Sequence, residues 1–468
     1  MSLEMSSNNN KGKAVVKQEE SSPPVPVVDG EQKILLVNKV KEESSPLAPS
    51  KPPIAEAASF PAGSQQHGVV SGSTFLKNII MKCVAALGIW NVMGANAELQ
   101  SLSFFATAIS DPLQRVAFVF AEALARRVMW LLPGLGWAMQ LQVLQPSATT
   151  PAAINSARQS FAALHPLLCA AATSANHAIL EATVAESTVH VIDLCGASLN
   201  QWFKLISLFA ARPGGPPSLR LSVVHEQDEF LSHAAGLLTE EAVHLHVPFA
   251  FIPVRSHIDH FSPLNIAALG VVHGQGDALV ITSTLQLHRL ITDEVSIEVP
   301  VLADLTATHQ MTKADVLLRV LRDLRPKLLV LTEQEADHNG AYLSDRVLNA
   351  FDYYSVLFHD TEAVSLVDRV AMERTLLREE VMDIVTCDGV LWRERHEKLA
   401  HWTQRMQLAG FEAVPVNTNL LKETATLAYQ MSINGGLCYE IRKVDNGHIF
   451  LYSRKVPIFS VSTWRPVH

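Results

Sequence analysis

Short β-rich runs alternate with helical stretches over most of the chain after Glu186, and no other feature of the sequence constrains the fold as strongly. The helical stretches are residues 201–211, 230–243 and 317–324. Because parallel strands must be joined by a crossover that returns over the sheet, this alternation predicts an α/β fold, with a mostly parallel sheet and helices on both faces. The predicted strands are residues 189–194, 219–225, 246–252, 278–282, 327–332 and 412–416.

Further strand-like runs fill the end of the chain, at residues 438–444, 447–452 and 458–463. Asp445, Asn446 and Gly447 form a turn signal between the first two runs. Strands joined by such a tight turn pair antiparallel. We therefore expect an antiparallel edge on an otherwise parallel sheet.

Between Ser73 and Ala182 the apolar residues follow a helical period. Within residues 114–128 they recur at intervals of four, at Val116, Phe120, Leu124 and Val128. This spacing predicts a packed amphipathic helix. Two more helices are predicted, at residues 152–168 and 173–185.

Residues 1–73 are rich in Ser, Pro, Lys, Glu, Gln and Gly and contain almost no aromatic residues. Such a composition cannot bury enough apolar surface to offset chain entropy, so we expect a disordered tail. One short phrase occurs in it twice, with a lysine in a SUMO-acceptor pattern followed by Ser-Pro. A solvated charge run is the alternative interpretation. The candidate modification sites are Lys17, Ser22, Lys41 and Ser45.

The charge and the cysteines exclude several classes of protein. A net charge of -9 lacks the basic footprint of a protein that neutralises many phosphates by itself. The five cysteines are scattered without Cys-x-x-Cys spacing, so neither a disulfide framework nor a zinc cluster is indicated. No metal-ligand spacing is evident among the histidines either, since nothing completes the pair His257 and His260. We also find no uninterrupted apolar run of 18 or more residues suited to crossing a membrane.

Several segments, taken in order along the chain, resemble the conserved blocks of the plant GRAS family. The central block is Val189, His190, Val191, Ile192 and Asp193, and a later block is Arg393, Glu394, Arg395, His396 and Glu397. The resemblance covers about residues 74–468 and is nearest to a scarecrow-like member. Other matching segments are Gln201-Trp202, residues 212–221, 285–290, 333–340 and 353–358, and a terminal block with Trp464.

The resemblance implies a Rossmann-like fold of the methyltransferase type, with residues 74–170 as a mostly helical cap and residues 171–468 as the α/β core. It also implies a nuclear transcriptional regulator or coregulator that is not an enzyme. Such a protein binds DNA-binding transcription factors, typically zinc-finger proteins of the indeterminate-domain class, and also other GRAS proteins. Contact with DNA would then be indirect. The alternatives are a small-molecule-binding or methyltransferase-like protein, and direct sequence-specific DNA binding.

In a methyltransferase fold the cofactor would lie beyond the first two strands, where the candidate residues are Asp193, Gly196 and Glu226. A single glycine there falls short of a full glycine-rich turn, so we expect no cofactor. The alternative for Asp193 is a structural acceptor that caps the following turn or helix. His190 alternates with two valines, which favours a hydrogen-bonded histidine within the sheet. The charged run 393–397 predicts either an exposed helix with ion pairs or, as the resemblance favours, a network inside the domain.

Overall fold

The structure is a computed structural model, and its described residues belong to one compact unit, Glu56–His468. Lys17, Ser22, Lys41, Ser45 and His260 lie outside the described residues, so the predictions made for them are untested. The described residues are 65–134, 150–196, 198–258, 268–271, 278–291, 294–295, 311–415, 438–443 and 447–467.

One nine-stranded sheet runs through this unit in the order β3-β2-β1-β4-β7-β11-β10-β9, with β8 paired to β11. The first five strands in this order are parallel, and the remaining pairs are antiparallel. The predicted mostly parallel sheet with an antiparallel edge is therefore confirmed. The strands are β1 (Thr188–Asp193), β2 (Ser218–His225), β3 (Phe249–Arg255), β4 (Ala278–Thr284), β7 (Leu328–Gln334), β8 (Phe411–Ala413), β9 (Tyr439–Lys443), β10 (Ile449–Ser453) and β11 (Val456–Pro466).

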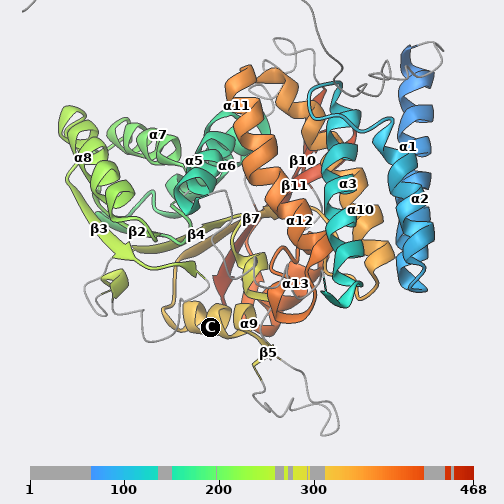
Figure 1. Cartoon of the computed structure of the whole chain (residues 1–468). Coiled ribbons are helices and arrows are strands. Elements are labelled where there is room, and N and C mark those ends of the chain that lie inside the picture. The colour runs from blue at the N-terminus through green and yellow to red at the C-terminus, as the bar shows by residue number, and fades with distance from the viewer. Residues whose placement is uncertain are drawn as a thin grey trace, which may run out of the picture. The chain divides into compact units, whose positions relative to one another are not determined.

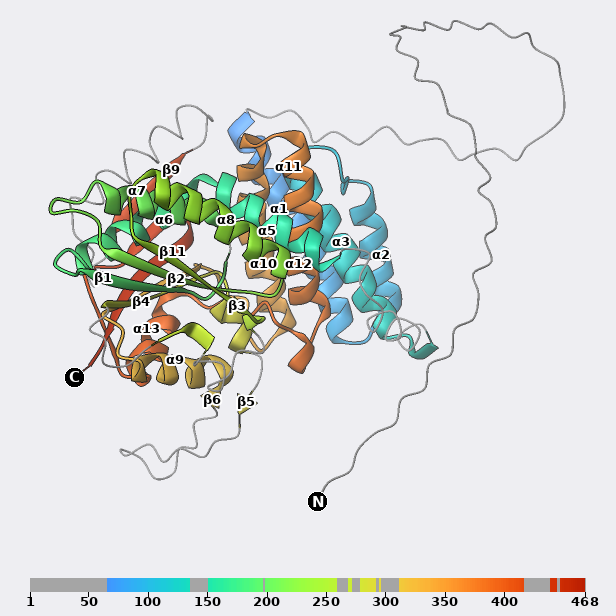
Figure 2. The ribbon, with the colours of Figure 1, turned by 90° about the vertical axis from the view of Figure 1, so that its left-hand side faces the viewer.

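Helices cover both faces of this sheet, as Figures 1 and 2 show. Val189 and Val191 of β1 belong to the core under one set of helices, and Ile192 belongs to the core on the other face. This is the period-two alternation of a strand that is buried on both sides. The helices on the first face are α6 (Pro166–Ala182), α7 (Leu199–Ala210) and α8 (Asp228–His244), and those on the second are α9 (Lys313–Asp323) and α13 (Leu399–Leu408).

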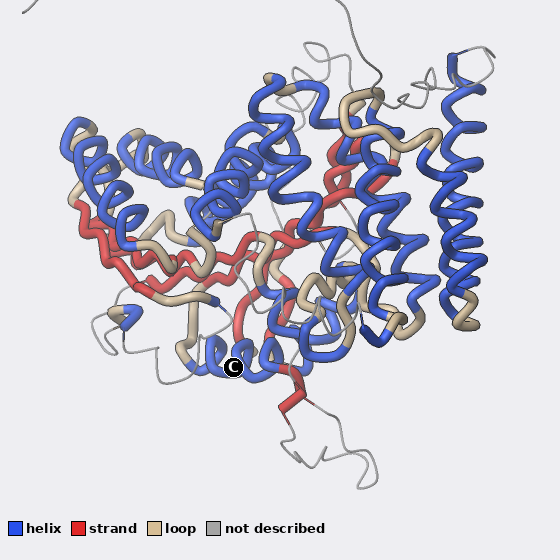
Figure 3. Tube along the Cα trace, viewed as in Figure 1, coloured by secondary structure: helices blue, strands red, loops and turns tan. Residues whose placement is uncertain are grey.

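A bundle of helices packs beside the antiparallel end of the sheet (Figure 3). It brings together α1–α3 with helices from much later in the sequence, because α3 packs against both α10 and α12. Arg115 of α3 is buried in this contact, where its Nε donates to Glu373 Oε2 at 2.8 Å. The bundle contains α1 (Gln65–Gly88), α2 (Val92–Ser103), α3 (Pro112–Trp130), α10 (Leu343–Asp360), α11 (Leu366–Ala371), the π-helical turn η5 (Met372–Leu377) and α12 (Arg378–Thr386).

The prediction for two of the helices needs correction. Helices at 152–168 and 173–185 were expected, but α5 (Pro151–Leu164) ends earlier and α6 begins at Pro166. Proline disfavours helical backbone in the residue before it and suits the first position of a helix. His165 therefore adopts extended backbone, and its Nδ1 accepts from the backbone N–H of Leu167 at 3.3 Å, capping α6.

Two further strand predictions differ from the structure. Residues 246–252 were expected as a strand, but β3 begins at Phe249, because His246 has a φ of +57° and the N–H of Val247 bonds back to Ala242. Val416, the end of another predicted strand, lies outside the described residues. The remaining short elements are a two-stranded sheet and three 3₁₀ turns. In the sheet, β5 (Glu294–Val295) pairs antiparallel with β6 (Met311–Thr312). The turns are η3 (Leu287–Ile291), η4 (Thr361–Ala363) and η6 (Gly389–Leu391).

Within the part of the chain that the structure describes, we find no helix with both the length and the apolar character needed to cross a bilayer.

The predicted apolar stripe of α3 provides a test of the bundle. Phe120 is fully buried, and its ring lies 5.4 Å from that of Phe351 in α10. Phe120→Ala should lower the free energy of unfolding by about 3–5 kcal/mol, since it removes a large side chain from a packed site. Phe118, two positions away on the same helix, is 41% exposed, so Phe118→Ala should cost less than about 1 kcal/mol. Chemical denaturation measures both, and equal losses would contradict the packing of α3.

Candidate functional site

The carboxyl ends of β1, β2, β4 and β7 meet at one edge of the sheet, because these strands are parallel. The chain runs from β1 outward to β3 and then returns to β4 on the other side of β1. In open α/β sheets, ligands bind beyond the carboxyl ends of the strands at such a reversal. This edge is therefore the candidate functional site.

Asp193, at the end of β1, is buried and its carboxylate is held on both sides. Oδ1 accepts from the backbone N–H of Cys195 at 3.0 Å and from its thiol at 2.8 Å. Oδ2 accepts from the indole Nε1 of Trp202 in α7 at 2.9 Å. Burial raises the pKa of Asp193 even though these hydrogen bonds oppose the shift. The geometry matches the structural alternative, in which Asp193 fixes the turn after β1 and the start of α7.

Gly196 and Glu226 also make contacts with neighbouring residues of the protein. Gly196 has a φ of +58°, and a Cβ built on it would lie 3.1 Å from the His225 ring and 3.3 Å from Phe230. Glu226 accepts a hydrogen bond from the amide of Asn155 in α5 and lies 3.6 Å from His257 Nε2. The close approach that a glycine allows is thus used for packing within the protein.

A small cavity remains between Gly196, Glu226 and α5. Its volume of about 30 Å³ is enough for one or two water molecules and far too small for a nucleoside. Its lining includes Arg158, Cys195, Gly196, Glu226, His257 and Gln286.

His190, in the middle of β1, lies away from this edge within the sheet. Its Nε2 lies 2.8 Å from Ser222 Oγ, and that hydroxyl donates to the carbonyl oxygen of Leu269 at 2.7 Å. Because a hydroxyl has one proton to donate, His190 Nε2 must be the donor to Ser222. His190 is therefore the hydrogen-bonded sheet histidine that its alternation predicted.

The charged run 393–397 takes no part in a helix, so the exposed-helix alternative is wrong. Asp383 of α12 accepts hydrogen bonds from the backbone N–H groups of Arg393, at 2.7 Å, and Glu394, at 3.1 Å. Glu394 Oε2 lies 2.8 Å from His288 Nε2, and His288 Nδ1 lies 2.8 Å from Glu333 Oε2. These contacts connect α12, η3 and the end of β7, and they form the internal network that the family resemblance favoured.

The other family-motif residues extend this network. His396 Nδ1 lies 2.9 Å from His338 Nδ1, and burial lowers the pKa of both imidazoles, to about 3 for His338. Glu397 accepts from Arg405 Nε at 2.7 Å and from the amide of Asn339 at 2.8 Å.

Two further motif residues have structural contacts. Arg395 stacks over the ring of Trp392 at 4.1 Å and donates to the carbonyl of Gly389 at 2.9 Å. Trp464 is buried in β11, and its indole donates to Ser462 Oγ at 2.9 Å. These residues hold the fold together and present no catalytic constellation among the residues described.

The network carries strongly shifted pKa values. Burial alone would lower the pKa of His288, but Glu333 and Glu394 outweigh it and raise that pKa to about 10. Burial, together with the negative charge of Glu394, raises the pKa of Glu380 to about 7 and that of Asp383 to about 7. At neutral pH the His288 imidazole is therefore positively charged, whereas the carboxyl groups of Glu380 and Asp383 are only partly ionised.

Sequence spacing could not reveal this network, because its members come from distant segments. Among the described residues, His288, Glu394 and His396 place one possible metal-ligand atom each within 4.8 Å of one another. His288 and Glu394 are 106 positions apart in the sequence. No short motif reports such a cluster.

The raised pKa of Glu380 makes stability depend on pH. A carboxyl group whose folded pKa lies above its unfolded value stabilises the fold at low pH and loses that contribution as pH rises, here from about 4.5 to about 7. Glutamine cannot ionise but can still accept the hydrogen bond from Tyr354, which measures 2.7 Å in the wild type. As pH rises across this range, the free energy of unfolding of Glu380→Gln should therefore increase by on the order of 2–3 kcal/mol relative to that of the wild type.

Urea denaturation at pH 4.5 and pH 8 measures this difference. Glu240→Gln, at an exposed position on α8, is the matched control and should show no such change with pH. If the difference in free energy of unfolding between Glu380→Gln and the wild type were the same at both pH values, the raised pKa of buried Glu380 would be contradicted.

Comparison with known proteins agrees with this arrangement. The family model for the GRAS domain family matches residues 76–465. Scarecrow-like protein 3 of Arabidopsis thaliana is 33% identical over 438 residues, which is 84% of this chain and 89% of that protein. GRAS family protein TF80 of Medicago truncatula is 30% identical, over 82% of this chain and 94% of that protein.

A solved structure is similar as well. The crystal structure of SCL7 in Oryza sativa superposes with a TM-score of 0.65 at 25% identity, covering 83% of this chain and 99% of that chain. A sheet in Rossmann-like order, the network built on the motif residues and a family match over most of the sequence together show that this chain belongs to the GRAS family.

Proposed function

We propose that this protein is a nuclear transcriptional regulator or coregulator that acts by binding DNA-binding transcription factors. Relatives in the same family include DELLA protein GAI of Arabidopsis thaliana and Chitin-inducible gibberellin-responsive protein 2 of Oryza sativa, and GRAS proteins of the Scarecrow-like and DELLA types are plant transcriptional regulators. The net charge of -9 suits a protein that leaves the phosphate contacts to its partner. The proposed partners are zinc-finger proteins of the indeterminate-domain class and other GRAS proteins.

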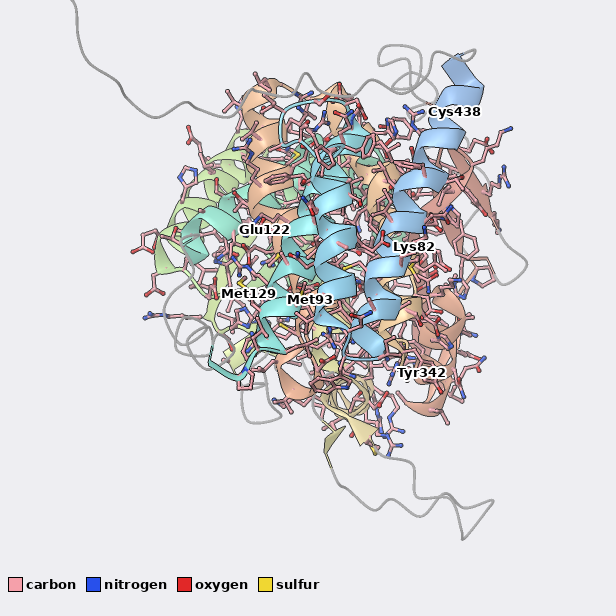
Figure 4. All side chains as sticks on the ribbon, turned by 45° about the vertical axis from the view of Figure 1, so that its right-hand side comes forward. Lys82, Met93, Glu122, Met129, Tyr342 and Cys438 are labelled. Atoms are coloured by element: carbon pink, nitrogen blue, oxygen red, sulfur yellow. The ribbon has the colours of Figure 1, made fainter. Side chains whose placement is uncertain are left out.

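The observation that carries this proposal is an exposed apolar cluster at the turn between α1 and α2. Ile89, Trp90 and Met93 are 74%, 73% and 78% exposed, respectively. Large apolar side chains gathered on a surface mark interaction sites, and Trp and Met are enriched in protein interfaces. Figure 4 shows Met93 on this face, with Lys82 of α1 and Glu122 of α3 on the neighbouring helices.

Hydrogen bonds fix the backbone of the turn that carries these side chains. Trp90 has a φ of +57°, and its N–H donates to the carbonyl of Leu87 at 3.1 Å. Asn91 donates to the carbonyl of Ala86 at 2.9 Å, and its side chain caps α2 by accepting from Gly94 N–H at 2.9 Å. A preorganised apolar surface loses little entropy when a partner binds.

The interior of the candidate site favours the same function. The cavity beyond β1 and β2 holds no more than about 30 Å³, and its surroundings are satisfied by contacts within the protein. The proposal therefore places no nucleoside cofactor at this edge of the sheet. The expected division into a tail to residue 73, a cap over 74–170 and a core over 171–468 is adjusted in this proposal, because α1 begins at Gln65 and because α10 and α12 pack with α3. The helical bundle then carries partner binding.

Introducing negative charge at the α1–α2 turn tests the proposal. The double variant Ile89→Glu/Met93→Glu should weaken binding to an indeterminate-domain zinc-finger protein by at least about tenfold, because interface hot spots cost 2 kcal/mol or more when removed. Both positions are exposed, so the melting temperature should change by no more than about 2 °C. Calorimetric titration and thermal denaturation of the full chain measure the two effects.

Val243→Glu is the matched control, because Val243 is 68% exposed on α8, which Figure 1 shows on the opposite side from α1 and α2. It should bind the zinc-finger protein as the wild type does. Equal binding by the double variant and the wild type would reject the surface. Tight DNA binding with steep salt dependence in the absence of a partner, or binding of S-adenosylmethionine, would instead support the two alternative functions.

A further inference from the structure

We propose that His288, Glu394 and His396 form a zinc site, with His288 Nε2, Glu394 Oε2 and His396 Nε2 as ligands. The two imidazole nitrogens lie 2.8 Å and 3.5 Å from the same carboxylate oxygen, and all three atoms lie within 4.8 Å of one another. Around a tetrahedral Zn²⁺ with ligands at about 2.0–2.1 Å, ligand atoms are separated by about 3.3 Å. The two imidazole rings have centroids 4.1 Å apart and planes at 36°, so zinc binding requires both rings to rotate until their Nε2 lone pairs meet at one metal ion.

The second, independent observation is the state of His396. Its side chain is fully buried, and among the described residues none forms a hydrogen bond with its Nε2, which points toward Glu394 at 3.5 Å. Its Nδ1 is occupied by His338 Nδ1 at 2.9 Å. A neutral imidazole that donates its single N–H through Nδ1 presents a lone pair at Nε2, which is the form that binds a metal.

The surroundings orient the ligands as in established zinc sites. Glu333 Oε2 lies 2.8 Å from His288 Nδ1, and Glu333 Oε1 accepts from the backbone N–H of Leu287 at 2.9 Å. A carboxylate behind a histidine ligand fixes the ring and raises its basicity. His338 takes the corresponding position behind His396.

The charges and the available space also suit a divalent cation. Arg289 Nε lies 3.8 Å from the other oxygen of Glu394, Oε1, so the proposed ligand oxygen faces the imidazoles instead. A cavity of about 20 Å³, lined in part by His288, Arg289, Glu380 and Glu394, has room for the water that would complete the coordination.

The ligand set selects the metal class and fixes the proton balance. Two imidazoles and one carboxylate suit Zn²⁺, whereas Mg²⁺ prefers oxygen ligands alone. Without the metal, both ring nitrogens of His288 are protonated, with Nδ1 donating to Glu333 and Nε2 donating to Glu394. Zn²⁺ must displace the proton at Nε2. Binding therefore releases one proton per zinc ion from His288, with no change in oxidation state, and weakens as pH falls.

Titration of the metal-free, tag-free full chain with zinc chloride tests the site. We expect one Zn²⁺ per chain at pH 7.5, with about one proton released, measured by calorimetry in buffers of different ionisation enthalpy. His396→Asn keeps a polar atom near the position of Nδ1 but removes Nε2, and it should weaken binding at least about tenfold. His233→Asn, at an exposed histidine on α8, should leave zinc affinity unchanged.

Co²⁺ binding separates this site from adventitious binding by the five cysteines. The site predicts visible absorption bands of a nitrogen- and oxygen-ligated Co²⁺ without the near-ultraviolet band of a cobalt–thiolate bond. If His396→Asn does not fold, the wild type still decides: Zn²⁺ should raise its melting temperature at pH 7.5 and much less at pH 5.5, and Mg²⁺ should not. A thiolate band, equal affinity in the His396 and His233 variants, or no thermal response to Zn²⁺ would overturn the proposal.

Discussion

The arrangement of the whole carboxyl edge depends on one buried interaction, the His288 imidazole between the carboxylates of Glu333 and Glu394. Glu333 ends β7, His288 lies in η3 after β4, and Glu394 lies in the extended segment that α12 holds through Asp383. Removing one partner from such a buried set leaves an uncompensated charge, at a cost of about 3–5 kcal/mol. The two parallel strands and the later helices therefore keep one relative position.

In the function we propose, this Rossmann-like sheet serves a role other than cofactor binding. The edge where such a sheet usually meets its ligand is occupied here by contacts of the protein itself, from Asp193 with Trp202 to Gly196 against His225. Fold alone does not fix function, and the site decides. One apolar surface that faces solvent lies at the α1–α2 turn, on the bundle that α10 and α12 support.

The sheet could be predicted from the sequence because its strands are short apolar runs with a strict period, as in β1, where Val189, Val191 and Ile192 divide between two cores. The break at His165 was missed because the apolar pattern continues across Pro166, so backbone restriction and not hydrophobicity decides the boundary. The network was beyond prediction from spacing, since Glu333, His288 and Glu394 meet only through the topology of the sheet. Trp90 was missed as well, because a pattern of apolar residues cannot tell an exposed turn from a buried one.

The central claim is that the exposed α1–α2 turn, and not the carboxyl edge of the sheet, is the working surface. Hydrogen exchange of the full chain tests it directly, measured alone, with an indeterminate-domain zinc-finger protein and with S-adenosylmethionine. The account predicts slower exchange at the amides of residues 89–94 with the zinc-finger protein and no change at Cys195, Gly196 or Glu226 with S-adenosylmethionine. Protection at Cys195, Gly196 and Glu226 by S-adenosylmethionine, with unchanged exchange at residues 89–94 in the presence of the zinc-finger protein, would contradict it.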